Sequence, residues 1–563
     1  MSALRRIERR APVAPGNEWP PAWPQVLRRV HAARGSANAS EAMPRLGDLL
    51  PYTGLIGIEA AVTLLADAME RNAHIVVVGD FDCDGATACA VGVRGLRMLG
   101  ARRVSHAVPN RIVHGYGMTP GLVEELAALA PDLLVTVDHG IACHPGIAAA
   151  KARGWQVLVT DHHLPGASLP DADAIVDPNQ PGDSFASKAM AGVGVMFYVL
   201  LALRARLGVP ADLAALLDLV AVGTVADMVA LDTNNRALVG GGLRRLRTGQ
   251  GCAGLRALIE VAGRNEAGLS TADIGFAIGP RINAAGRLED MGIGIECLLS
   301  DDAAQARELA EVLHRINQER RGVQAGMQDL AEAQLAALDD LHAPVAVCLH
   351  DPDWHPGVVG LVASKLKDRL HRPAIAFAPL ETGSVRLRGS ARSVPGFHIR
   401  DALARVDACH PGLIERFGGH AMAAGLSLHI DQLQAFTAAF LAVAEAWLTP
   451  DLLTEHVASD GALDAEDFSI QAALALRDGG HWGQGYPEPV FDGVFEVLAW
   501  RIIGERHLKL ELGQGGRRLN AIHFGGWDGV QPEAAVRLAY RLAPDDYRGG
   551  DAIQLVVIHR EPA

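Results

Sequence analysis

Carboxylates gather where the sequence predicts the end of a buried strand. The apolar run HIVVVG at 74–79 is followed at once by Asp80, Asp82 and Asp84. Three carboxylates at alternate positions in so small a space repel one another strongly unless divalent cations neutralise them. The segment therefore predicts a metal site just past the strand.

Two other interpretations of this acidic segment are possible. A calcium-binding EF-hand loop also begins D-x-D-x-D-G, but its twelfth position needs Glu, and Val91 stands there. An EF-hand also needs a helix before the loop, where this chain has a predicted strand. A solvated acidic turn without a metal stays open as the second alternative.

Two further predicted strands end in side chains that can bind metals. LLVTVD ends in Asp138, and WQVLVTD ends in Asp161, which is followed by His162 and His163. Parallel strands bring their carboxyl ends to one edge of a sheet, where ligands bind. Asp227, at the end of the predicted helix AVGTVAD, would be an ordinary helix-end acid by itself.

The elements that must position these residues alternate between strands and helices. Repeated β-α-β order predicts a parallel, doubly wound α/β sheet. Residues 190–265 look helical, and 302–338 form one helical stretch of roughly 55 Å, which we interpret as an interdomain spacer. A second α/β unit begins at VAVCLH and closes near Leu448. The tail has short strands and Gly-rich turns, which predict a small barrel.

Composition bounds the class of protein. The chain has 563 residues, of which 49% are hydrophobic and 21% charged, so three or four globular domains are expected and a fibrous or disordered protein is excluded. The net charge of −14 argues against indiscriminate coating of nucleic acid, but it permits a local basic track. The uncharged apolar stretch between Lys188 and Arg204 is too short for a membrane span.

Two features of the sequence indicate in which cellular compartment the protein is located. The basic N-terminus MSALRRIERR is followed by no apolar region, so we expect no signal peptide. Seven scattered cysteines without a C-x-x-C pair predict reduced thiols and a cytoplasmic location.

The motifs, taken in order, resemble a known family. GDFDCDG, VTVDHG, TDHH and AVGTVAD are similar to the four motifs of the DHH phosphoesterase superfamily. VPNRIVHGYG, GPRINAAGRL, WHPGVVGLVASKL, RGSARSVPGF and FGGHAMAAGL resemble its RecJ branch, the single-strand-specific 5′→3′ DNA exonucleases of bacteria. The resemblance runs from about residue 50 to the C-terminus, and WGQGYPEPVFDGVFEV is similar to the start of that family's OB-fold.

The resemblance implies an arrangement of domains. An N-terminal extension would be followed by a DHH catalytic domain with a parallel sheet, a connecting helix, a second α/β domain of the DHHA1 type and an OB-fold β-barrel. The expected boundaries are 1–50, 51–300, 301–342, 343–450 and 460–563.

The resemblance also implies two divalent cations, Mn²⁺ or Mg²⁺, and assigns their ligands. Oxygen ligands suit either ion, imidazoles favour Mn²⁺, and the excess of carboxylates disfavours Zn²⁺. Asp138 is the expected bridge between the two ions. The residues assigned to the metals and to catalysis are Asp80, Asp82, Asp84, Asp138, His162, His163 and Asp227.

A second set of residues is implied to bind the substrate. Arg111, Tyr116, Ser390 and Arg392 would hold a terminal 5′ phosphate, and Arg281 and Asn283 would lie nearer the scissile phosphate. Arginine also grips phosphate oxygens bidentately, and exposed glycine N–H groups approach phosphates closely. Trp354, His355 and Tyr116 could stack on bases, although Trp354 could equally be packed inside the second domain. The remaining candidates are Arg287, Gly418, Gly419 and His420.

Two residues depart from the family pattern. His139 follows the expected bridging Asp138, where relatives have Asn or another small polar residue, and it could contact a metal-bound water or tune the site. Cys83 stands where relatives often have Ala. Because carboxylates flank it, we expect a raised thiol pKa and poor nucleophilicity.

The implied function is metal-dependent 5′→3′ hydrolysis of single-stranded DNA to mononucleotides in DNA repair, including mismatch repair, and recombination. The implied partners are single-stranded DNA with a 5′ end, single-strand-binding protein and a RecQ-type helicase, with no membrane and a monomeric enzyme. Small-substrate DHH hydrolases are the first alternative, but they are shorter and lack the barrel. A degenerate scaffold is the second, but it would have lost metal ligands.

Overall fold

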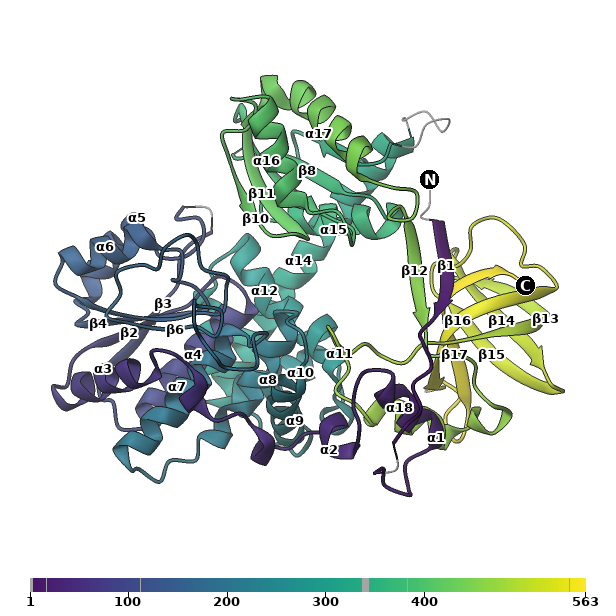
Figure 1. Ribbon diagram of the computed structural model, residues 1–563, viewed down its shortest axis with the longest axis horizontal. Coiled ribbons are helices and arrows are strands. Elements are labelled where there is room, and N and C mark those ends of the chain that lie inside the picture. Colours follow the sequence, from purple (N-terminus) through teal and green to yellow (C-terminus); the bar gives the residue numbers. More distant parts are fainter. Residues whose placement is uncertain (1–3, 17, 112, 337–343, 382, 546) are drawn as a thin grey trace. The chain divides into compact units, whose positions relative to one another are not determined.

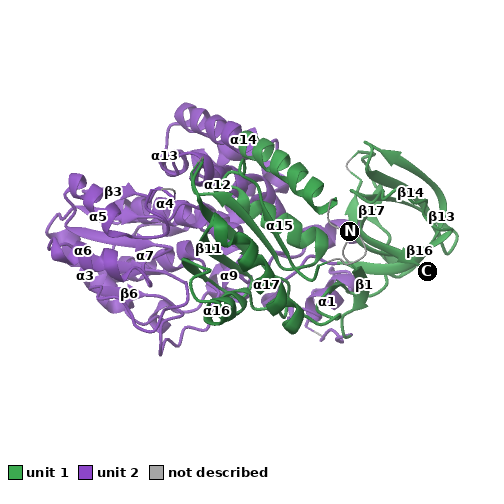
Figure 2. Ribbon diagram, turned by 90° about the horizontal axis from the view of Figure 1, so that it is seen from above, with its two compact units in different colours: residues 1–11, 318–470, 490–563 green, residues 12–317, 471–489 purple. Residues whose placement is uncertain are grey.

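The computed structural model describes the chain except residues 1–3, 17, 112, 337–343, 382 and 546. The chain forms two compact units, coloured separately in Figure 2. Unit 2 holds residues 12–317 and 471–489, and unit 1 holds residues 1–11, 318–470 and 490–563. The chain therefore passes several times between the units.

Unit 2 is built on a parallel sheet of five strands in the order β3-β2-β4-β5-β6. The strands are β2 (Ile75–Val78), β3 (Val104–Ala107), β4 (Leu133–Val137), β5 (Gln156–Thr160) and β6 (Ala174–Val176). Their β-branched side chains are buried on both faces, as a doubly wound sheet requires. The predicted parallel α/β sheet is confirmed.

Helices cover both faces of this sheet (Figure 1). One face packs against α5 (Pro120–Leu126) and α6 (His144–Ala152) through Val76, Leu134 and Val157. The other face carries α3 (Ile58–Glu70), α4 (Cys83–Met98) and α7 (Gly192–Leu207).

Helix α4 begins inside the acidic segment. It starts at Cys83, and the Asp82 side chain caps it by accepting a hydrogen bond from Gly85 N at 3.0 Å. Aspartate is a favoured N-cap because its carboxylate satisfies an otherwise unpaired N–H at the helix start. The acidic segment is thus partly loop and partly the first helical turn.

A helical layer completes unit 2. Its main elements are α8 (Leu217–Ala226), α9 (Thr233–Arg247), α10 (Ala253–Val261), α11 (Thr271–Asp273), the π-helical turn η6 (Ile274–Ile278), α12 (Gly279–Leu288) and α13 (Gly292–Leu299). Near the N-terminus lie α1 (Gln25–Ala32) and α2 (Ala39–Ala42). Helix α18 (Ile470–Asp478) begins the late segment that returns to this unit.

The predicted long helix is present as α14 (Ala303–Ala336). Its first half belongs to unit 2 and its second half to unit 1. Residues 337–342 of the expected connecting segment lie outside the described residues.

Unit 1 contains the second α/β sheet, in the order β10-β11-β9-β8-β7. The strands are β7 (Val347–His350), β8 (Ala374–Pro379), β9 (Arg386–Arg392), β10 (Arg416–Gly419) and β11 (Ala423–His429). The helices are α15 (Val359–Leu370), α16 (Ile399–Cys409) and α17 (Leu433–Trp447). Phe377, Phe436 and Phe440 are fully buried in its core.

The C-terminal strands close into a five-stranded barrel, as the tail predicted, in the order β13-β14-β15-β17-β16. They are β13 (Phe491–Ile503), β14 (His507–Gln514), β15 (Arg517–His523), β16 (Ala535–Pro544) and β17 (Ile553–Pro562). Strand β1 (Leu4–Arg9) pairs in parallel with β12 (Thr454–Ser459), a pairing that the sequence did not reveal.

Within the described part of the chain, no single helix has the length and apolar character needed to cross a membrane. One bent pair, Leu46–Gly54 with Ile58–Glu70, meets that test by length and composition alone, as core helices also can.

Candidate metal centre

The predicted metal ligands converge at the carboxyl edge of the parallel sheet. Three overlapping groups of side chains each bring their ligand atoms within 4.8 Å of one another. The groups are Asp80, Asp82 and Asp138; Asp138, His162 and His163; and Asp84, His162 and Asp227. All seven residues assigned to the metals therefore lie in one cluster.

Several buried ligand atoms in this cluster lie close to one another without forming a hydrogen bond. Asp80 Oδ1, Asp138 Oδ1 and His162 Nε2 are buried and form no hydrogen bond with the described residues. His162 Nε2 lies 3.0 Å from Asp138 Oδ1 and 3.6 Å from Asp227 Oδ2. Buried polar atoms are rarely left unsatisfied, so these lone pairs fit a site built for divalent cations.

The shifted pKa values of the clustered side chains reflect the same absence of positive charge to balance the carboxylates. Burial, and then the neighbouring Asp82 carboxylate, raise the pKa of Asp80 to about 8. Burial and the surrounding carboxylates raise the pKa of Asp138 well above its usual range, and burial raises that of Asp227 to about 7. Burial lowers the pKa of His162 to about 4, so the ring is neutral and can act as a ligand. Dications would favour the ionised carboxylates.

Asp84 is held by the start of another helix. Its two carboxylate oxygens accept hydrogen bonds from Gly192 N at 2.6 Å and Val193 N at 3.0 Å, the first residues of α7. Gly223 also packs closely, because a Cβ there would lie 2.7 Å from Asp84 Oδ1. With both oxygens engaged, Asp84 is fixed firmly within the cluster.

Asp161 is buried beside the cluster and hydrogen-bonded to two of its members, although the sequence did not assign it to the metal site. It is buried and accepts hydrogen bonds from Ile141 N at 2.8 Å, His162 N at 2.7 Å and His163 Nδ1 at 2.8 Å. Burial alone would raise its pKa, but the hydrogen bond and charge of His163 bring the pKa below the ordinary value. The same pairing raises the pKa of His163 to about 9 against the effect of burial. In the sequence, the position of Asp161 directly after a strand and next to two histidines was the signal that it belongs to this site.

Arg111 and Tyr116 lie beside the acidic loop. The Arg111 guanidinium carbon stands 4.0 Å from the centre of the Phe81 ring, and the Tyr116 ring meets Phe81 edge-on at 6.0 Å. The Tyr116 hydroxyl is 3.3 Å from His163 Nδ1 and 3.4 Å from the Asp138 carbonyl oxygen. The structure thus brings both predicted substrate residues to the metal cluster.

Helix α12 supports the cluster from another side. Asn283 Oδ1 accepts a hydrogen bond from Cys83 N at 2.9 Å, so it fixes the start of α4. Arg281 donates from Nε to His314 Nδ1 at 3.1 Å and from Nη1 to the Ala277 carbonyl at 2.5 Å. Arg287 lies half-buried in the last turn of the same helix.

In unit 1, Ser390 and Arg392 lie next to the first turn of α15. Arg392 Nη1 donates to Ser390 Oγ at 3.1 Å, and a Cβ on Gly360 would lie 3.1 Å from both Ser390 Oγ and Arg392 Nη2. A helix N-terminus presents unpaired N–H groups and partial positive charge. Together with a guanidinium and a hydroxyl, it forms a site suited to an anion.

The glycines of FGGHAMAAGL lie on an exposed part of the same sheet. Gly418 pairs with Gly425, and Gly425 pairs with Ser390, so the three stand in one row across the strands. Gly419 has φ of +142° at the turn, where a Cβ would lie 2.4 Å from the Ala423 carbonyl oxygen. His420 is exposed in the turn itself.

The structure corrects one of the suggested stacking residues. Trp354 is only 3% exposed, so its ring packs inside the domain and offers no free face to a base. His355 is half-buried, and its Nδ1 accepts a hydrogen bond from Gly357 N at 3.1 Å, just before α15. Trp354 was named for its residue type, which does not reveal burial.

The two residues that depart from the family pattern are both buried. Burial and the flanking carboxylates raise the pKa of Cys83 well above its usual value, as expected for an unreactive thiol. Burial lowers the pKa of His139 to about 4, and His139 belongs to none of the three groups that could hold a metal.

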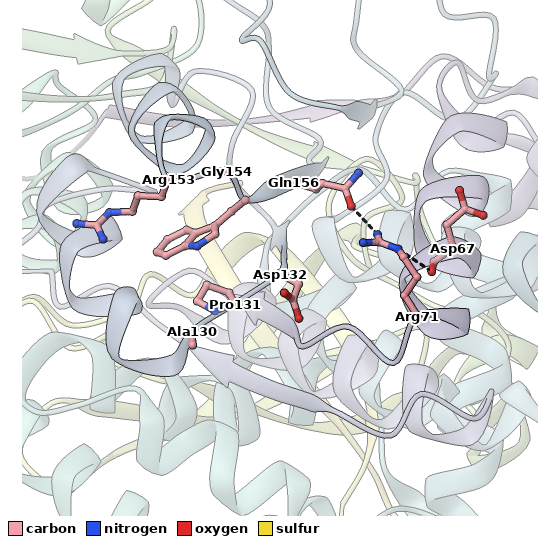
Figure 3. A pocket seen from close by; sticks show the side chains of 9 residues that line it. Asp67, Arg71, Ala130, Pro131, Asp132, Arg153, Gly154 and Gln156 are labelled. Atoms are coloured by element: carbon pink, nitrogen blue, oxygen red, sulfur yellow. Dashed lines mark hydrogen bonds between the residues drawn. The ribbon is translucent and has the colours of Figure 1, made fainter.

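A hollow of unit 2 lies at the opposite edge of the sheet. It measures about 730 Å³ and is lined by the end of α3 and by residues that precede or begin strands β4 and β5 (Figure 3). Arg71 there donates to Gln156 Oε1 at 2.8 Å and to the Asp67 carbonyl at 3.2 Å. Because ligands of open α/β sheets bind at the carboxyl edge, this hollow is not the catalytic site.

Models of three domain families match the chain. They are the DHH family N-terminal domain at residues 74–224, the DHHA1 domain at 342–446 and the RecJ OB domain at 459–559. A relative from Dickeya dadantii, named single-stranded-DNA-specific exonuclease RecJ, is 48% identical over 100% of both chains.

Solved structures show the same architecture. The crystal structure of RecJ in complex with Mn²⁺ from Thermus thermophilus matches with a TM-score of 0.81 and 33% identity, covering 96% of this chain and 76% of that one. The Mg²⁺ complex of the same protein matches with a TM-score of 0.76 and 30% identity, covering 96% and 74%.

Proposed function

Because the chain belongs to the RecJ family of single-stranded-DNA-specific exonucleases, we propose that it hydrolyses single-stranded DNA from the 5′ end and releases mononucleotides. The observation that carries the proposal is the cluster of buried, unpartnered carboxylate and imidazole atoms at the carboxyl edge of the sheet. Such atoms fit two divalent cations, Mn²⁺ or Mg²⁺. We place this activity in DNA repair and recombination.

The residues that would hold the cations are Asp80, Asp82, Asp84, Asp138, His162, His163 and Asp227. A pair of divalent cations supplies an activated water and stabilises the leaving oxygen in phosphodiester hydrolysis. Asp138 belongs to two of the three groups, and its two carboxylate oxygens could each serve one cation position, whereas His162 would serve one. Neutral His162 offers Nε2 as a ligand atom, and Asp161 holds the His162 backbone N–H and the His163 ring through hydrogen bonds.

Other residues of the chain orient the ligands and the substrate. Asp84 is anchored to the start of α7, and Asn283 fixes the start of α4. Arg111, stacked on Phe81, brings a positive charge to the acidic loop and would bind a phosphate of the strand. Arg281 and Arg287, on α12, would bind further phosphates.

The 5′ end would be recognised by Ser390, Arg392 and the first turn of α15. A terminal phosphate carries more charge than an internal one and suits a guanidinium beside a helix N-terminus. The exposed backbone at Gly418 and Gly419, together with His420, would contact the DNA strand at this sheet. Binding the terminal phosphate in a dedicated site would give the reaction its 5′→3′ direction.

The other expected properties extend this proposal. We propose that the protein works as a monomer in the cytoplasm, with single-strand-binding protein and a RecQ-type helicase as partners. The barrel, which matches the RecJ OB domain, would lengthen the grip on the strand. Sedimentation of the purified protein and binding assays with each partner would test these points separately.

A gel assay tests the activity itself. The full chain is incubated with 5′-labelled and 3′-labelled single strands in Mn²⁺, with matched duplexes and with EDTA. We expect labelled mononucleotide from the 5′-labelled strand at once, progressive shortening of the 3′-labelled strand, little attack on blunt duplex and no product in EDTA. Cleavage that starts at the 3′ end, or that persists in EDTA, would overturn the proposal.

A further inference from the structure

Phe276 exposes more of its surface than any other large apolar side chain described in unit 2. Its exposed fraction is 86%. A single exposed apolar residue needs no explanation by itself, but a phenyl ring left in water forgoes the stabilisation that burial would give. The place of Phe276 in the fold is more informative than its exposure.

Phe276 lies in the π-helical turn η6 between α11 and α12. Such turns are rare, occur mostly as single-turn bulges inside α-helices, and are frequently found at functional sites. In this turn Ile274, Ala277 and Ile278 are buried, whereas Phe276 alone among the large side chains faces solvent. The turn therefore presents one aromatic ring outward.

The inner side of this segment packs against the metal centre's own helix. A Cβ on Gly275 would lie 3.8 Å from Val225 Cγ1, and one on Gly279 would lie 3.1 Å from Ala226 Cβ. Val225 and Ala226 directly precede Asp227, one of the more exposed members of the cluster, with a side chain 20% exposed. The turn that carries Phe276 is thus fixed against the end of α8.

Helix α12 links Phe276 to the acidic loop from the other direction. Asn283, which accepts the hydrogen bond from Cys83 N, follows Phe276 by seven residues, or roughly 10 Å along a helix axis. Met228, the residue after Asp227, is also 71% exposed. Asp227 therefore has exposed apolar side chains both next to it in the chain and on the turn that packs against its helix.

We propose that Phe276 stacks on a base of the single strand whose phosphate lies at the metal centre, and so positions that strand for cleavage. This inference rests on the proposed function. An aromatic ring recognises every base by its flat face, which suits an exonuclease that must accept any sequence. A base within a duplex is already paired and stacked on both sides, so this contact also favours single strands.

The test combines a change in the protein with a missing base in the DNA. kcat/KM is measured in Mn²⁺ on 5′-phosphorylated single strands that each lack one base, at successive positions from the 5′ end. Stacking is worth about 1–3 kcal/mol per base, so Phe276→Ala should lower kcat/KM on the intact strand by roughly 5- to 150-fold. The wild-type protein should show a similar loss on one abasic strand, and the two losses should not multiply.

Three variants sharpen the result. Phe276→Trp keeps an aromatic face and should retain the wild-type profile, whereas Phe276→Leu keeps the apolar character and should lose the dependence on the base. Leu129→Ala, an exposed apolar residue at the amino edge of the sheet, should change nothing. Thermal melting should be similar for all, because Phe276 is exposed.

The outcomes separate this inference from the proposed function. If the wild-type protein does not cleave single strands, the function itself fails. If it cleaves, and Phe276→Ala keeps the wild-type kcat/KM or the same abasic profile, only the role of Phe276 is overturned.

Discussion

Asp138 occupies the central place among the acidic side chains. It belongs to one group with Asp80 and Asp82 and to another with His162 and His163. Its carboxylate is buried, and Oδ1 has no hydrogen-bond partner among the described residues. A carboxylate that can contribute an oxygen to each of two neighbouring positions is the natural bridge between two cations.

Replacing Asp138 by Asn should weaken both metal sites together, because the change keeps the size but removes a charge from between two dications. We expect less than about one per cent of wild-type activity, a loss of at least about 2.7 kcal/mol of transition-state stabilisation. Calorimetric titration with Mn²⁺ checks the binding. Asp227→Asn is the matched control and should weaken one site more than the other. Two Mn²⁺ bound to Asp138→Asn with wild-type affinity would refute the bridging role.

Arg392 carries the second residue-scale prediction. Charge-assisted hydrogen bonds are worth about 1.5–3 kcal/mol, so Arg392→Ala should reduce the preference for 5′-phosphorylated over 5′-hydroxyl strands by roughly one to two decades. The ratio of kcat/KM for the two substrates is the measurement. Arg386→Ala, on the same strand but paired with Glu415 at 2.6 Å, serves as the control. An unchanged ratio in Arg392→Ala would place the phosphate elsewhere.

At the scale of elements, the register of the second sheet places a glycine that the fold does not need beside two residues assigned to the substrate. Gly425 of β11 is exposed and does not have a positive φ, and a Cβ there would meet no atom within 4 Å. The fold itself therefore does not require glycine at this position. Its cross-strand neighbours are Gly418 and Ser390, both candidates for contact with the DNA backbone.

Gly425→Ala should consequently leave the fold intact and weaken substrate binding. Alanine in a strand avoids the entropic cost of glycine, so the melting temperature should stay the same or rise slightly, by the equivalent of about 0.4–1 kcal/mol. The KM for long single strands should rise about tenfold while kcat is kept, if a strand passes over this row. Gly322→Ala on α14, also in open space, is the control. An unchanged KM would remove the row from the substrate path.

The sequence predicted those elements whose pattern is local. The β-branched runs that became β2, β4 and β5 sit in a sheet buried on both faces, so their apolar character shows in the sequence. Strand β3 is a short edge strand with only half-buried Ser105, His106 and Ala107, which gives little pattern. Strand β1 escaped prediction because its partner β12 lies about 450 residues away. The start of α4 does not show in the sequence, because Asp82 serves as its N-cap within a run of carboxylates.

The same distinction applies to the candidate site. Acid and histidine at strand ends identified the cluster, because parallel strands deliver those ends to one edge. Asp161 stands at a strand end before two histidines, which was a signal, but its hydrogen bonds from the backbone N–H groups of Ile141 and His162 do not show in the side-chain pattern. Phe276 gave no signal, since an aromatic residue in an apolar helix is ordinarily buried.

Another element-scale feature is the anchoring of α1 to the segment 471–489. His31 is fully buried, its Nε2–H donates to the Gly479 carbonyl at 2.8 Å, and its Nδ1 accepts from the Tyr486 hydroxyl at 2.7 Å. Burial, and then the positive charges of Arg34 and Arg236, lower its pKa to about 4. The ring is therefore neutral in the folded protein.

This buried histidine should make stability fall as the pH falls from about 6.5 towards 4. In that window the unfolded chain binds a proton and the folded chain does not, so the free energy of unfolding decreases. At pH 5 the loss should be about 2 kcal/mol for His31 alone. Urea unfolding at pH 7.5 and pH 5 measures it. His31→Gln should show a shallower dependence, although His481, whose pKa is also about 4, preserves part of it. Equal dependences would contradict the assignment.

At the scale of the whole molecule, the C-terminal region of the chain is divided between the two units. Residues 490–563, including the barrel, belong to unit 1, whereas residues 471–489 belong to unit 2. Within unit 2, Trp482 stacks on His31 at 5.1 Å, and its carbonyl accepts a hydrogen bond from Thr271 Oγ1 at 2.6 Å. A truncation that removes the barrel can therefore either keep or destroy a part of the catalytic unit.

Two truncations should thus behave differently. Ending the chain at residue 490 should weaken binding of long single strands and shorten processive runs, but spare metal-dependent cleavage at saturating substrate. Ending it at residue 459 also removes buried Leu476, Trp482 and Tyr486. Each is worth about 2–3 kcal/mol of burial, so the melting temperature of the catalytic unit should fall by more than about 5 °C relative to the first truncation. Calorimetry with the two proteins, alongside the full chain, makes the comparison. Equal melting temperatures would show that residues 471–489 contribute nothing to the stability of unit 2. Complete loss of turnover in a well-folded chain ending at residue 490 would show that the barrel takes part in the chemistry.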